Sequence, residues 1–193
     1  MKTAAQKPSG NDWILALILT AIVVAGRLLP HPANITPIAA AGILGFALFD
    51  RGWLALVVQA AGLLISNLFL PMEHSATMLF IHLGMFLPAF LGIPLRKALG
   101  GSFVMPGILA GVGSALIFYL FSNLGVFLWS GMYPLNVAGL VSCYAMALPF
   151  LVRSLIGDVF FVVSFLFLAR TILSYQARAQ DARLESAQGS LPH

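Results

Sequence analysis

Long apolar runs alternate with short polar breaks along nearly the whole chain. A run of about 20 apolar residues is what an α-helix needs to cross the hydrocarbon core of a bilayer. The pattern therefore predicts six membrane-spanning helices joined by short connections. The expected spans cover residues 13–29, 37–49, 53–70, 77–95, 103–129 and 154–175.

Two proline-containing segments modify this layout. The apolar segment 137–150 is too short to span comfortably and is closed by Pro149, so we expect a re-entrant or interfacial segment before the last span. Pro88 lies inside the fourth expected span and predicts a kink there. Residues 1–175 are thus expected to form a single all-α transmembrane domain, and residues 176–193 a polar cytoplasmic tail.

Composition narrows the class of protein. Of the 193 residues, 60% are hydrophobic and 8% are charged, against about 25% charged in soluble domains. So few polar groups cannot cover a water-soluble surface, which excludes a soluble domain, a disordered chain and a nucleic-acid binder. The single cysteine, Cys143, excludes a disulfide framework and a four-cysteine zinc site. The lipid bilayer is therefore the expected surrounding.

The few charges also orient the chain. Lysine and arginine are enriched in the cytoplasmic loops of membrane proteins. If both termini are cytoplasmic, all but two of the ten basic residues fall on the cytoplasmic side, and Glu73 and His74 fall in an outer loop. The basic residues on the cytoplasmic side are Lys2, Lys7, Arg51, Arg96, Lys97, Arg170, Arg178 and Arg183.

The two exceptions, Arg27 and Arg153, lie near the outer ends of the first and last spans. Ionisable groups at membrane depth usually face a protein interior or a water-filled cavity. Further polar residues reach the same level and predict a cavity open to the outside. They are His31, Asn34, Asn67, Glu73, His74, His82, Asn123 and Asp158. Snorkelling of Arg153 to headgroups and hydrogen bonding between helices by the asparagines are the competing interpretations.

Candidate chemistry is sparse. Asp158 is the only acid expected inside a span, which is little for proton-coupled transport. No nucleophile elbow, phosphate loop or pair of carboxylates is present, so we expect no enzyme activity and no intrinsic cofactor. Two alternatives stay open: a membrane enzyme acting on a lipid or isoprenoid, and a structural membrane protein without a ligand. The pairs Ala21-xxx-Ala25 and Gly107-xxx-Gly111 predict close helix packing.

Several stretches resemble a known family. These are residues 27–40 (RLLPHPANITPIAA), 66–70 (SNLFL), 122–126 (SNLGV) and the run from Tyr133 to Asp158 that includes Cys143 and Tyr144. Together they resemble the S-components, the substrate-binding proteins of bacterial energy-coupling-factor (ECF) vitamin transporters. The resemblance implies six helices, an outward-facing vitamin pocket and a location in the bacterial inner (cytoplasmic) membrane.

Within that family the solitary cobalamin-transporting type is the most similar. The resemblance implies uptake of a vitamin, with cobalamin as the transported ligand and Tyr144 among the binding residues. It also implies that Ala21 and Ala25 dock a transmembrane coupling subunit, which would bring its ATPases. Cobalamin-type members carry a cysteine near the start of the fourth span that can ligate cobalt. This chain has none there, and Met78, His82 or Met85 would have to replace it.

Overall fold

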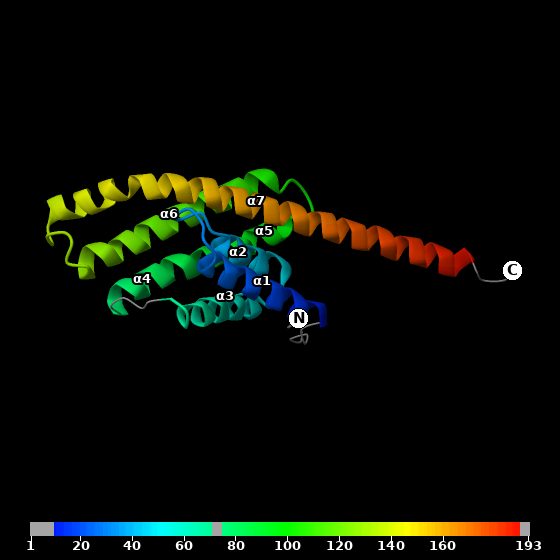
Figure 1. Ribbon diagram of the computed structural model, residues 1–193. Helices are drawn as coiled ribbons and strands as arrows, with labels where there is room; N and C mark the ends of the chain where they lie inside the picture. The colour runs from blue at the N-terminus through cyan, green and yellow to red at the C-terminus, as the bar shows by residue number, and fades with distance from the viewer. Residues whose placement is uncertain (1–9, 71–74, 190–193) are drawn as a thin grey trace, which may run out of the picture.

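The computed structural model describes residues 10–70 and 75–189, in which every regular element is a helix (Figure 1). Four residues used in the charge argument, Lys2, Lys7, Glu73 and His74, lie outside the described residues, as do residues 190–193. The elements are α1 (Gly10–Leu28), α2 (Ile38–Leu48), α3 (Gly52–Asn67), α4 (Ser75–Phe86), the 3₁₀ helix η1 (Leu87–Leu91), α5 (Gly92–Ala98), α6 (Val104–Trp129) and α7 (Val137–Gly189).

Three helical stretches of the described chain are long and apolar enough to cross a membrane. They are Ala76–Ala98, Val104–Trp129 and Val137–Tyr175. The helices α2 and α3 are also apolar but shorter, with 11 and 16 residues. The described chain is therefore all-helical, with helices that could span a membrane as the apolar pattern predicts, while the count of six spans stays a prediction.

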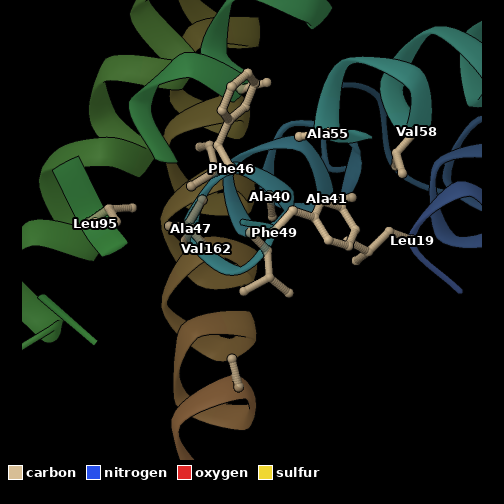
Figure 2. Packing of buried hydrophobic residues seen from close by; sticks show 14 of the residues in the cluster. Leu19, Ala40, Ala41, Phe46, Ala47, Phe49, Ala55, Val58, Leu95 and Val162 are labelled. Atoms are coloured by element: carbon tan, nitrogen blue, oxygen red, sulfur yellow. The ribbon is translucent and has the colours of Figure 1, made fainter. Parts of the chain in front are cut away.

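The short helix α2 forms the centre of the core. Its residues from Ile38 to Ala47 are all buried, because an apolar helix can be enclosed on every side. Helices α1, α3, α5 and α7 and the 3₁₀ turn η1 pack around it. Phe46 and Phe49 of this segment lie among side chains from several of these helices (Figure 2). This enclosure fixes the start of α2, which borders the cavity described below.

Pro88 accompanies a change of helical pitch at the place where the sequence predicts a kink. It lies in η1, between α4 and α5, where the chain tightens into a 3₁₀ turn. A proline removes one backbone donor from the helical ladder, which favours such a change of pitch. Gly92 then begins α5 so close to α2 that a Cβ there would lie 2.0 Å from the carbonyl oxygen of Ile43. The small residue is required by this close approach.

The expected re-entrant segment is wrong. Residues 137–150 are the first part of α7, which runs without a break from Val137 to Gly189, with Pro149 inside it. Pro149 is exposed, and the helix continues through it. The helices α6 and α7 lie side by side and antiparallel (Figure 1). The segment therefore makes no turn of its own before the last span.

The polar stretch after Tyr175 also continues this helix. The backbone of α7 stays helical as far as Gly189, and its end projects well away from the other helices (Figure 1). The polar C-terminal part expected from the sequence is thus a direct extension of the last apolar helix.

Candidate functional site

Arg27 connects α1 to α3 through a set of hydrogen bonds. It lies in the last turn of α1, where a positive charge also interacts favourably with the helix dipole. Its Nη1 donates to the carbonyl oxygen of Leu63 at 3.2 Å, to Oγ of Ser66 at 2.9 Å and to Oδ1 of Asn67 at 2.5 Å. All three acceptors come from the last turn and a half of α3. They fix the position of the guanidinium, so Arg27 does not simply extend to lipid headgroups.

The network continues from Asn67 to His82 of α4. Nδ1 of His82 donates to the carbonyl oxygen of Met78 at 2.6 Å, which leaves Nε2 to accept from the Asn67 amide at 3.0 Å. Both ring nitrogens are thus engaged, and a metal at Nε2 would have to displace Asn67. In the described part of the chain, no three His, Cys, Asp or Glu side chains cluster as a metal site.

A cavity of about 190 Å³ lies beside this network, between α1, α2, α4, α6 and α7. Its apolar wall includes Ile38, Ala39, Met85 and Phe118. His31, in the connection between α1 and α2, borders it and is exposed, so the cavity reaches the surface there. Its polar lining residues are Arg27, His31, Asn34, Thr36, Ser114, Ser154 and Asp158.

Asp158 provides the negative charge of this cavity. It is 7% exposed, and the buried hydroxyl of Ser114 on α6 donates to its Oδ2 at 2.6 Å. Arg27 lines the same cavity but forms no ion pair with Asp158. The acidic and the basic side chain therefore line a shared space without a direct ion pair. The sequence signal for Asp158 was its position as the only acid in an apolar span, whereas nothing in the sequence distinguished Ser114.

The loop at the mouth of the cavity has a specific shape. Asn34 adopts a φ of 64°, a left-handed conformation that asparagine tolerates better than most residues. The following Ile35 lies against α7, where a Cβ at Gly157 would come within 3.1 Å of its Cα. Asn34 is half-buried and lines the cavity.

The sequence profile of one family of unknown function, DUF6580, matches residues 7–181. The chain belongs to the DUF6580 family. No curated protein matches it, and no solved structure matches it. Membership therefore adds no activity to this DUF6580 protein, and the chemistry of the cavity has to be argued from its own residues.

The structure brings together only part of the site predicted from the sequence. Arg27, Asn34 and Met85 line the cavity. Asn67 accepts a hydrogen bond from Arg27, and His82 is linked to Arg27 through Asn67. Asn67 and His82 also border a second, otherwise apolar hollow between α3 and α4.

The remaining predicted residues lie elsewhere. Arg153 is exposed, with its guanidinium carbon 5.9 Å from the centre of the Phe150 ring. Asn123 donates to the carbonyl oxygen of Tyr119, one turn back on α6, and the hydroxyl of Tyr144 donates to Leu120. These three residues therefore belong to the packing and surface of α6 and α7 rather than to the cavity.

The pair expected to dock a partner lies on α1. Ala21 is exposed and Ala25 is half-buried. Ala21 shares its side of the helix with exposed Leu17 and Ile14, which are three or four residues apart. This face is accessible to lipid or to another helix, and its role as a docking surface stays a prediction.

Replacing His82 with leucine is expected to lower the stability of the protein by about 1–3 kcal/mol, because it leaves the Asn67 amide N–H without its acceptor and removes the side-chain hydrogen bond to the Met78 carbonyl. The midpoint of thermal unfolding of the detergent-solubilised protein measures this. Leu79→Ala, at an exposed neighbouring position of α4, is the matched control and should change the midpoint little. Equal losses in both variants would show that the hydrogen bonds of His82 do not matter.

Proposed function

We propose that this protein is a membrane uptake protein that binds a small solute carrying a carboxylate in the cavity between Arg27 and Asp158. The observation that carries the proposal is the position of Arg27. Its Nη1 is fixed by three acceptors of α3, while the side chain also forms part of the cavity wall. A guanidinium has five N–H donors. In the described chain those on Nε and Nη2 have no hydrogen-bond partner and are available to a carboxylate.

The size of the cavity limits the solute. Small-molecule pockets usually measure about 300–1,000 Å³, whereas a cavity of about 150 Å³ accommodates a benzene ring. A space of about 190 Å³ therefore favours a compact acid with one small ring or a short chain. Uptake of a small vitamin such as a pyridine carboxylic acid fits these dimensions. Uptake of cobalamin remains a prediction that requires a much wider cavity than this one.

The surrounding residues have separable roles in this proposal. Arg27 binds the carboxylate, Met85 and Phe118 pack against the apolar part of the solute, and Asn34 with His31 lines the entrance. The six spans, the cytoplasmic termini and the bacterial inner membrane belong to the same proposal, with the entrance on the outer side. A coupling subunit at Ala21 and Ala25 would be an additional partner.

Calorimetric titration of the purified protein with matched acids and amides tests this function. Nicotinate and benzoate should bind, whereas nicotinamide and benzamide, which have nearly the same shape but no charge, should bind at least about 10-fold more weakly because they lose a charge-assisted hydrogen bond to Arg27. Cobalamin is included to test the corrinoid prediction. Binding of neither acid, or equal binding of acid and amide, would contradict the proposed function.

A further inference from the structure

Asp158 is a buried ionisable group to which the binding step assigns no role. It is the only acidic residue in the long and short apolar stretches Ile38–Leu48, Gly52–Asn67, Ala76–Ala98, Val104–Trp129 and Val137–Tyr175. A charged carboxyl at membrane depth is expensive, and such residues commonly mark ion or proton pathways.

The groups that face Asp158 leave its charge uncompensated. From α6 it receives the hydrogen bond of Ser114, and Arg27 of α1 lines the same cavity without an ion pair to it. The connection between α1 and α2 contributes His31 at the mouth. Helix α2, which also packs on α7, has no ionisable side chain, and Arg153 of α7 itself is exposed. Neutralisation of Asp158 therefore depends on Arg27 or on a proton.

We propose that Asp158 takes up a proton together with the solute and that this proton energises entry, an inference that rests on the binding function proposed above. On the outer side the carboxylate accepts a proton from hydronium and releases water. On the inner side the neutral carboxyl returns the proton to water as the solute leaves. No bond of the solute changes. The chain carries no nucleotide-binding motif, so an ion gradient is an energy source that the protein can use by itself.

The coupling follows from the shared cavity. Arg27 and Asp158 line the same cavity, so a solute bound to the guanidinium lies near the carboxyl. A bound carboxylate neutralises Arg27 and adds a negative charge near Asp158, which favours the protonated form. By thermodynamic reciprocity, the proton on Asp158 strengthens binding of the carboxylate by the same factor. Solute and proton therefore enter the cavity together.

Proton uptake during binding tests the inference. The wild-type protein in weakly buffered detergent solution is titrated with nicotinate, and a pH-indicator dye reports about one proton taken up per solute bound if Asp158 titrates with it. Asp158→Asn should take up no proton per solute bound, whatever its affinity. The matched control is Asp50→Asn, which makes the same change at an exposed carboxylate 3.8 Å from Arg96 and should retain the uptake.

A second variant keeps the inference testable if Asp158→Asn does not fold. Ser114→Ala retains the carboxyl and removes only its hydrogen bond, so proton uptake should persist. Infrared spectra should show a protonated-carboxyl band that appears with nicotinate and is absent from Asp158→Asn.

The outcomes separate the two proposals. Binding of nicotinate by the wild type without proton uptake, or uptake that persists in Asp158→Asn, would overturn the role of Asp158 and leave the binding function intact. The absence of binding by either acid would overturn the binding function and this inference with it.

Discussion

Arg27→Gln is expected to reduce the affinity for a bound carboxylate by at least about 30-fold, because losing one partner of a buried, hydrogen-bonded charge pair costs about 2–5 kcal/mol. Glutamine is uncharged and too short to reach the three acceptors on α3 and the cavity at once. Calorimetric titration with nicotinate measures the loss. The affinity of Arg27→Lys for nicotinate should lie between those of the wild type and Arg27→Gln. Lysine keeps the charge but lacks the planar guanidinium that binds a carboxylate through two nitrogens.

The chain offers a matched control for this substitution. Arg153→Gln removes the same charge from an exposed position outside the cavity, and the affinity should stay within about 2-fold of the wild type. The hydrogen bonds of Arg27 also join α1 to α3, so circular dichroism should first show that both variants are folded. A comparable loss of affinity in Arg153→Gln would indicate that the solute binds near α7's surface and not in the cavity.

Gly111→Ala is expected to destabilise the protein by about 1–3 kcal/mol or more, as overpacking in a closely packed interior does. A Cβ at this position of α6 would lie 2.6 Å from Cα and 2.8 Å from the nitrogen of Val159. These are backbone atoms of α7, so no side chain can move aside and the two helices must separate. Since Ser114 is less than one turn further along α6, its hydrogen bond to Asp158 should weaken as well.

Gly101→Ala is the matched control for Gly111→Ala. No atom lies within 4 Å of a Cβ at Gly101, so the unfolding midpoint should hardly change. Thermal unfolding in detergent compares the two variants, and proton uptake with nicotinate reports on the Ser114–Asp158 pair. If both alanine variants unfold at the wild-type temperature, close approach of α6 and α7 at Gly111 is not needed for stability.

The sequence predicted the helical class and the small residues, but not the path of every helix. Gly107 and Gly111 were expected at a close helix contact, and α7 does pack against both. Pro88 and Pro149 are chemically identical, yet one accompanies a 3₁₀ turn and the other lies within a continuous helix. Pro88 is fully buried among neighbouring helices whereas Pro149 is exposed, and this difference in packing is not contained in the local sequence.

The candidate site was likewise predictable from the sequence only in part. Arg27 could be found from the charge pattern alone, because a cation that violates the orientation rule needs a protein environment. Arg153 violates the rule equally but is exposed, since the rotation of α7 about its axis places Ser154 and Asp158 toward the interior instead. Rotation is fixed by contacts with α6 and α2, which come from distant parts of the chain. Ser114 was missed because a lone serine in an apolar helix has no distinguishing pattern.

Because α7 is one unbroken helix, a small change of its tilt near the cavity becomes a large displacement at its C-terminal end. From Asp158 to Gly189 the helix extends over about 46 Å at 1.5 Å per residue, so a tilt of about 10° at the cavity would displace its far end by about 8 Å. If protonation of Asp158 tilts α7 slightly at the cavity, the resulting movement is therefore largest at the Gly189 end of the helix. A pair of fluorophores, one at the projecting end of α7 and one on α1, would report opening and closing of the cavity from a distance at which neither label disturbs it.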